Sequence, residues 1–126
     1  MVQIVYAAID PQQSYQLLRR RSAGSVLLHY AVVKADGGTG RASCAVDYFV
    51  GPETEAELAT IASALKTRWP LQGVLLQRRG GRLAVGEIIS LVAIAAEASS
   101  DAFAACQMGL ELLKRMQTVR KSEVFV

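Results

Sequence analysis

The sequence predicts a mixed α+β domain with three main helices. Runs of apolar and β-branched residues, which are typical of strands, are separated by stretches in which apolar residues recur at helical spacing. Along the chain these segments follow the order strand, helix, two strands, helix, two strands, helix. Such an order is typical of the α+β class. A chain of 126 residues can bury roughly two-thirds of its unfolded surface, and we expect one domain over residues 1–126.

The first half of the chain predicts three strands and one helix. The strands are expected over residues 2–8, 24–34 and 41–50. Asp10 suits an N-cap and Pro11 the first helical position, so a helix is expected from there to about residue 20. We expect the second and third strands to pair with each other across the glycine-rich loop between them.

The second half predicts two helices and two strands. Thr54 and Glu57 stand at capping-box spacing near the start of a helix that Pro70 ends. Strands are expected over 71–78 and 87–96, joined by a turn-rich connection at 79–86. The second of these has almost no polar residue, which predicts a central strand buried on both faces. The last helix begins near residue 99, and its apolar side is Ala102, Phe103, Cys106, Leu110 and Leu113.

The composition excludes several classes of protein. Apolar residues make up 52% and charged residues 20%, so the chain is globular rather than disordered. A net charge of +3 is too weak to require a nucleic acid partner, and an aromatic content of 6% argues against a base-stacking surface. The chain has one histidine and two cysteines that lie far apart, which argues against a zinc site. Cys44 and Cys106 are therefore predicted as reduced core residues of a cytoplasmic protein, without a membrane-spanning segment.

Basic residues near the C-terminus allow two interpretations. Lys114, Arg115, Arg120 and Lys121 follow one another closely. Cations at a helix end complement its dipole, which requires no ligand. The alternative is a site for an anionic substrate, and Lys121 favours it because this lysine lies past the expected helix end.

Three other features are weighed in the same way. Arg78, Arg79 and Arg82 surround two glycines. They could donate hydrogen bonds to a phosphate, but such arginines more commonly belong to an exposed hairpin turn. The glycine loop at residues 34–41 lacks a P-loop pattern, which favours a hairpin loop that could order on binding. His29 stands alone in a strand and is predicted to be structural.

From Thr67 onward the chain resembles the MoaE family, the large catalytic subunit of molybdopterin synthase. The resemblance begins with Arg68-Trp69-Pro70 and continues in the stretch from Gly81 to Glu87. It extends through the last helix from Ala102 to Lys114 and ends at Lys121-x-Glu123. The N-terminal half is similar more loosely, with Val33-Lys34 where the family has a strand ending in Val-Arg.

The resemblance implies an α/β hammerhead fold and a homodimer that binds a small ubiquitin-like, MoaD-like sulfur carrier at each end, a heterotetramer. The carrier's C-terminal Gly-Gly thiocarboxylate supplies the sulfur, so the resemblance implies no metal and no bound cofactor. The substrate that the resemblance implies is cyclic pyranopterin monophosphate, and the implied product is the dithiolene of molybdopterin. Lys114 and Lys121 match the two active-site lysines. The matched substrate-binding positions are Val33, Lys34, Ala98, Ser99, Lys121, Ser122 and Glu123.

The sequence also departs from the family's pattern. Lys34 replaces an arginine, and Ala98-Ser99 replaces a His-Arg pair before the last helix. Arg120 is an additional cation that could compensate. These departures leave a second interpretation open, a non-catalytic relative that keeps the dimer and carrier binding. A third and weaker one is a basic module that binds nucleic acid or another polyanion.

Overall fold

The computed structural model describes residues 1–19, 23–35 and 43–125. In these residues the chain forms three helices and two sheets, and the predicted α+β class is confirmed. The helices are α1 (Pro11–Leu18), α2 (Pro52–Arg68) and α3 (Ser99–Lys114). The strands are β1 (Val2–Val5), β2 (Ser25–Val32), β3 (Ser43–Phe49), β4 (Leu71–Arg79), β5 (Gly81–Ala84), β6 (Ile88–Ala96) and β7 (Arg120–Phe125).

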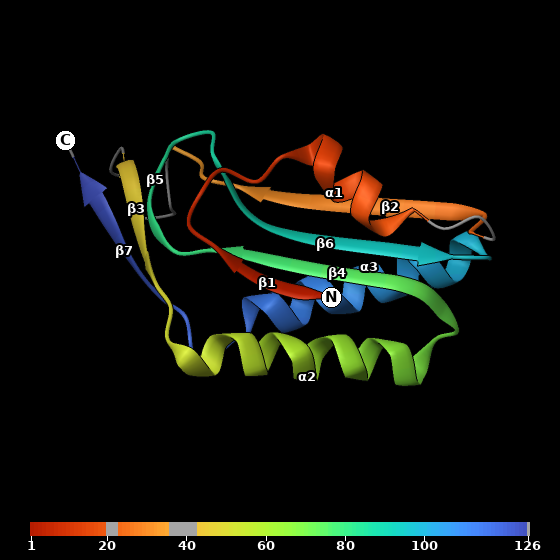
Figure 1. The fold of residues 1–126 in the computed structure, drawn as a ribbon. Coiled ribbons are helices and arrows are strands. Elements are labelled where there is room, and N and C mark those ends of the chain that lie inside the picture. The colour runs from red at the N-terminus through yellow and green to blue at the C-terminus, as the bar shows by residue number, and fades with distance from the viewer. Residues whose placement is uncertain (20–22, 36–42, 126) are drawn as a thin grey trace.

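The larger sheet has the strand order β1-β4-β6-β2 and forms the middle layer of the molecule. β1 runs parallel to β4, whereas β6 is antiparallel to both β4 and β2. Helices α2 and α3 cover one face and α1 lies on the other (Figure 1). Because both faces are covered, β6 is buried from Ser90 to Ala96, as its lack of polar residues predicted.

The smaller sheet has the order β5-β3-β7 and stands across one end of the larger sheet (Figure 1). The predicted pairing of the second and third strands is wrong, because β3 pairs with β5 and β7 instead. β5 lies inside the segment 79–86 that was predicted as a connection, and β7 was not predicted. Both strands are short and polar, so their residues carry little strand periodicity.

Two glycines let the chain pass from the larger sheet into the smaller one. Gly81 has a φ of 95°, a conformation that residues with a side chain rarely adopt. At Gly80 a Cβ atom would lie 2.7 Å from a ring carbon of Tyr6 and 2.8 Å from a methyl carbon of Val50. Glycine therefore suits both positions of this corner, Gly81 because of its φ and Gly80 because a side chain there would displace Tyr6 and Val50.

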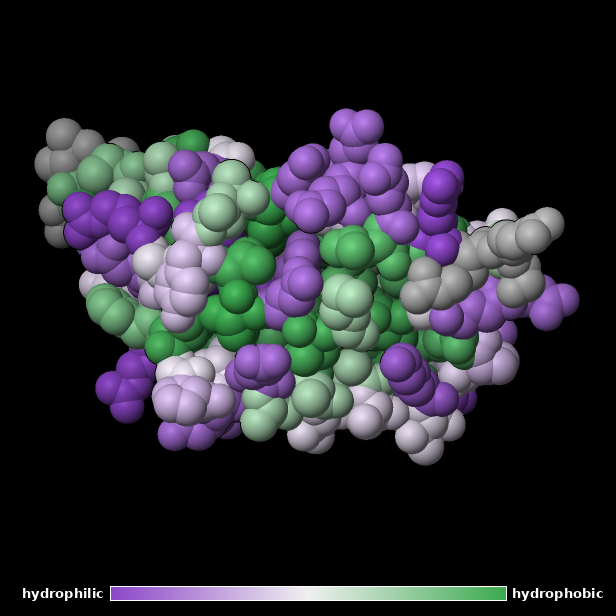
Figure 2. All heavy atoms as spheres, viewed as in Figure 1, coloured by the Kyte–Doolittle hydropathy of each residue, from purple (hydrophilic) through white to green (hydrophobic). Residues whose placement is uncertain are grey.

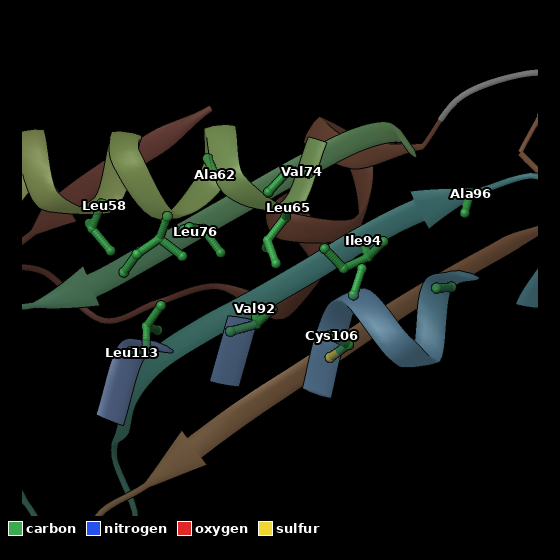
Figure 3. Close-up of a cluster of buried hydrophobic side chains, with 13 residues drawn as sticks. Leu58, Ala62, Leu65, Val74, Leu76, Val92, Ile94, Ala96, Cys106 and Leu113 are labelled. Carbon is green, nitrogen blue, oxygen red and sulfur yellow. The ribbon is translucent and has the colours of Figure 1, made fainter. Parts of the chain in front are cut away.

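The main core lies between the larger sheet and helices α2 and α3. Figure 3 shows Leu58 and Leu65 of α2 on one side of this core and Leu113 of α3 on another. Cys106 is buried here, as predicted. The prediction for Cys44 is wrong, because this thiol is exposed on β3. The pairing of β3 with β7 is irregular at this point, since Ser43 pairs with Phe125 and Ala45 with Val124, so Cys44 is the extra residue of a bulge and has no partner position on β7.

Helix ends agree with the predictions at α1 and differ at α2. The Asp10 carboxylate accepts a hydrogen bond from the amide of Gln12 at 3.0 Å, which confirms the predicted N-cap. The predicted capping box of Thr54 and Glu57 is wrong, since α2 already begins at Pro52. Thr54 stands in the first turn, where its hydroxyl accepts from the amide of Gly51 at 3.0 Å. The Glu57 carboxylate instead contacts the segment between α3 and β7.

The surface on the side of the edge strand β1 is partly apolar. Figure 2 shows hydrophobic residues across the middle of this face, between the hydrophilic surfaces of the helices. The described residues contain no helix that is long and apolar enough to cross a membrane. The predicted glycine loop at residues 36–40 lies outside the described residues.

Candidate functional site

A cavity of about 430 Å³ opens where both sheets meet the C-terminal end of α3. Of its described lining residues, four are cations and none is acidic. The cations are Lys34, Arg78, Lys114 and Lys121. The remaining wall consists of Ala31, Tyr48, Ile89, Ser90, Leu110, Leu113, Met116 and Val119. Such a lining suits an organic anion with an apolar body.

The backbone on either side of the cavity fixes the position of Lys34. Val33 is only 3% exposed and packs in the cluster between the two sheets. Its amide donates to the carbonyl of Glu87 at 3.0 Å, and its carbonyl accepts from the amide of Gly86 at 2.8 Å. Lys34 therefore leaves a rigid segment just beyond the end of β2, and its side chain is exposed.

Lys114 and Lys121 reach the cavity from different elements. Lys114 is the last residue of α3. Lys121 lies on β7 directly opposite Tyr48 on β3, and residues opposite each other in antiparallel strands project to the same face. The structure thus brings together three of the predicted site residues, Lys34, Lys114 and Lys121.

The neighbours of Lys121 on β7 are placed differently. Side chains alternate along a strand, so Arg120 and Ser122 project to the opposite face from Lys121. Neither lines the cavity. Glu123 is on the same face as Lys121 but does not line the cavity either, and its charge acts on Tyr48. Burial raises the pKa of Tyr48. The charge of the nearby Arg78 lowers this pKa, and the charge of Glu123 raises it.

Arg78 also lines the cavity, whereas the sequence analysis weighed it only with Arg79 and Arg82, apart from the lysines. Its Nη1 donates to the carbonyl of Leu113 at 3.4 Å, and its guanidinium carbon lies 5.7 Å from the centre of the Tyr48 ring. Burial lowers the pKa of Arg78, which the nearby Tyr48 and Glu57 oppose. An arginine in the last positions of a strand gives no sequence signal that distinguishes a cavity wall from a turn.

The interpretation of the three arginines as an exposed hairpin turn is wrong for Arg78 and Arg79, which end β4 and are at least partly buried, whereas Arg82 is exposed as predicted. Arg79 is buried and forms an ion pair with Glu87 at 3.2 Å, while its other terminal nitrogen donates to the Tyr6 carbonyl at 3.1 Å. Arg82 donates two hydrogen bonds to Asp47, at 2.8 and 2.9 Å. This arginine holds the pKa of Asp47 below its usual range. The charges of Arg79 and Arg82 are therefore paired with carboxylates of this chain.

The turn between α3 and β7 is held by α2. The Glu57 carboxylate accepts hydrogen bonds from the amides of Gln117 and Thr118, at 2.9 and 3.1 Å, and from the Thr118 hydroxyl at 2.6 Å. The buried Thr54 hydroxyl donates to the Thr118 carbonyl at 3.2 Å. This turn spaces Lys114 from Lys121, so the contacts with α2 position both lysines.

The charge of Glu57 is stabilised by these contacts. Burial raises the pKa of Glu57. The hydrogen bonds from Thr118 and Gln117, together with the charge of Arg78, lower it by more, so the pKa lies below its usual value. A carboxylate with a lowered pKa stabilises the folded state at pH values above the pKa of the unfolded glutamate. That contribution is lost as the pH falls through the folded pKa.

Glu57→Gln is expected to lower the free energy of unfolding by about 1–2 kcal/mol at neutral pH, because hydrogen bonds to a charged acceptor are replaced by weaker ones. The difference from the wild type should shrink as the pH is lowered below the glutamate range. Urea unfolding at neutral and acidic pH measures both quantities. Glu111→Gln, at an exposed position of α3, is the matched control. A destabilisation that is independent of pH would contradict a role for the carboxylate charge.

Ala98 and Ser99 lie at the other end of α3 from Lys114. A helix rises by 1.5 Å per residue, which separates Ser99 from Lys114 by about 22 Å along the axis. Both residues are exposed and neither lines the cavity. Their role in substrate binding stays a prediction.

The chain is similar to known proteins over most of its length. The family model described as MoaE protein matches residues 4–116. A molybdopterin synthase catalytic subunit from Nostoc sp. is 29% identical over 122 residues, which cover 95% of this chain and 73% of the relative. One from Caulobacter vibrioides is 34% identical over 104 residues, covering 82% and 68%.

Solved structures share the same fold. A crystal structure of molybdopterin synthase from Staphylococcus aureus superposes with a TM-score of 0.91 at 23% identity, covering 98% of this chain and 90% of the other. The α+β fold of this chain is thus shared with that structure. Because the family model matches residues 4–116, which is most of its length, the chain belongs to the MoaE family.

Proposed function

We propose that this chain is the catalytic subunit of a molybdopterin synthase. It transfers sulfur from the C-terminal thiocarboxylate of a small ubiquitin-like carrier to cyclic pyranopterin monophosphate. Two carriers each give up one sulfur atom and leave, after hydrolysis, with a C-terminal carboxylate, and the two sulfur atoms form the dithiolene of molybdopterin. Membership of the MoaE family supports this activity. The observation that carries the proposal is that Lys34, Lys114 and Lys121 line the same cavity, together with an apolar wall.

The cavity suits this substrate in charge and in shape. A phosphorylated pterin combines a flat ring system with a dianionic group. Apolar lining residues such as Leu110 and Val119 offer contact surface for the ring, and the ammonium groups of Lys34 and Lys121 attract the phosphate. The absence of acidic side chains from the described lining leaves that attraction unopposed.

We assign the chemical step to Lys114. Attack by the thiocarboxylate sulfur places negative charge on the substrate, and a positioned ammonium group stabilises it electrostatically. The departure of the carrier also requires proton transfer. An ammonium group can donate a proton and the neutral amine can accept one, which suits a general acid and base. Lys114 stands at the end of a sixteen-residue helix, so its backbone is held rigidly.

The activity can be tested with a thiocarboxylated carrier. The purified chain, this carrier and cyclic pyranopterin monophosphate are expected to yield a dithiolene product, detected by mass spectrometry. A carrier that ends in an ordinary carboxylate is the control and should give none. If the carrier binds but no dithiolene forms, the enzymatic proposal fails and a non-catalytic MoaE-like protein is the better interpretation.

A further inference from the structure

Arg78 is a partly buried cation that forms no ion pair within the described part of the chain, although the charge of Glu57 acts on it from nearby. The ion pairs found there are Arg79 with Glu87 and Arg82 with Asp47. Arg78 forms neither, although it comes directly before Arg79 on the same strand. Burying a charge is costly unless an opposite charge or hydrogen bonds compensate it. The position of Arg78 in the cavity wall therefore calls for an explanation.

The hydrogen-bonding capacity of Arg78 is also only partly used. Nη1 donates to the Leu113 carbonyl, but the buried Nε has no hydrogen-bond partner among the described residues. Buried donors without a partner are uncommon in native proteins, and strain, an ordered water or a missing ligand accounts for them. The Nε of Arg79 also lacks a partner, but Arg79 has its ion pair with Glu87, whereas Arg78 has none. A guanidinium has five N–H groups, so the contact with Leu113 leaves most of them available.

The orientation of the guanidinium is fixed before any ligand arrives. The guanidinium carbon lies over the Tyr48 ring, 5.7 Å from the ring centre, and the Leu113 carbonyl at the end of α3 accepts from Nη1 at 3.4 Å. Tyr48 is itself buried and packed in the cluster between the sheets. A planar fork held in this way presents paired donors to an oxyanion without losing rotamer freedom on binding.

The lysines of the cavity cannot supply the same geometry. Lys34, Lys114 and Lys121 are exposed on flexible side chains, and an ammonium group acts as a point charge. Arginine instead binds phosphate or carboxylate through two parallel hydrogen bonds. Of the four cations in the described lining, Arg78 is the one with this fork.

We propose that Arg78 is the oxyanion-binding residue of the cavity and that it donates paired hydrogen bonds to the phosphate of the substrate. The identity of the substrate rests on the proposed function, whereas the binding of a phosphate group can be measured without it. In this arrangement the lysines attract the anion and Arg78 determines where its phosphate is placed.

Titration with inorganic phosphate tests the proposal directly. Isothermal calorimetry or amide NMR shifts at low ionic strength give the Kd for the wild type and for Arg78→Lys and Arg78→Met. Arg78→Lys keeps the charge but loses the fork, and we expect its phosphate affinity to fall by roughly tenfold or more. Arg115→Met removes a nearby exposed cation that does not line the cavity, and its affinity should stay within about twofold of the wild type.

Three results would overturn the proposal. The first is a wild-type chain that does not bind phosphate, and the second is an Arg78→Lys variant that binds it as tightly as the wild type. The third is the unfolding of both Arg78 variants in thermal melts, which would make Arg78 a structural residue. A peptide ending in a diglycine carboxylate distinguishes the other source of an oxyanion. If its binding depends on Arg78 and that of phosphate does not, the residue serves the carrier and the proposal fails.

The outcome can be separated from that of the proposed function. If the wild type forms dithiolene but phosphate affinity does not depend on Arg78, the function stands and this inference fails. If no dithiolene forms but phosphate binding depends on Arg78, the oxyanion site stands alone. In an active enzyme, Arg78→Lys should raise KM for the pterin more than it lowers kcat.

Discussion

Lys114→Ala is expected to reduce the rate of sulfur transfer by roughly 100- to 10 000-fold, the range found when a general acid or base is removed. The lysine lines the cavity at the end of α3, and its side chain is exposed, so few packing contacts are lost with it. The variant should therefore keep its thermal stability. Single-turnover formation of dithiolene with excess thiocarboxylated carrier measures the effect on the chemical step.

Two further variants make this result specific. Lys114→Arg keeps the positive charge but cannot release a proton, so it separates electrostatic stabilisation from proton transfer. If it is as slow as Lys114→Ala, the proton matters most. Lys66→Ala removes an exposed lysine on α2, outside the cavity, and should leave the rate unchanged. A Lys114→Ala variant with a near-normal rate would assign the chemistry to another residue.

The elements of the larger sheet could be predicted because their residues carry strong local signals. β6 is an almost uninterrupted apolar run, and the start of α1 has both an N-cap aspartate and a proline. Such signals depend on neighbours in sequence. The pairing of β3 with β7 joins residues far apart in the chain, and nothing local to either strand specifies it. This is why the smaller sheet was mispredicted.

The candidate site was predictable only in part for a similar reason. Lys114 and Lys121 follow from a resemblance to a family, whereas their residue types alone fit a solvated helix end equally well. That they share a cavity depends on the turn held by Glu57 and Thr54, which form their contacts across more than sixty residues of sequence. Arg78 becomes visible as a cavity residue only when α3 and the smaller sheet are placed around it.

The packing of α3 against α2 and β6 determines where the cavity forms. Leu65 of α2 is fully buried, and Gly109 of α3 lies so close that a Cβ there would come within 3.2 Å of a Leu65 methyl carbon and 3.0 Å of a Val92 methyl carbon. Leu65→Ala should therefore lower the free energy of unfolding by about 2–5 kcal/mol, because the methyl groups that fill this space are lost and the space cannot fully collapse.

Urea unfolding followed by circular dichroism measures this change, with Lys66→Ala as the adjacent exposed control. The control should change the free energy of unfolding by less than about 0.5 kcal/mol. Leu65→Met keeps the volume and should cost less than about 1.5 kcal/mol. If Leu65→Ala lowers the free energy of unfolding by less than about 1 kcal/mol, the space has collapsed. Helix α3 would then have moved toward α2 to fill it. Lys114 and the Leu113 carbonyl would then move with it, so the phosphate affinity of that variant should change as well.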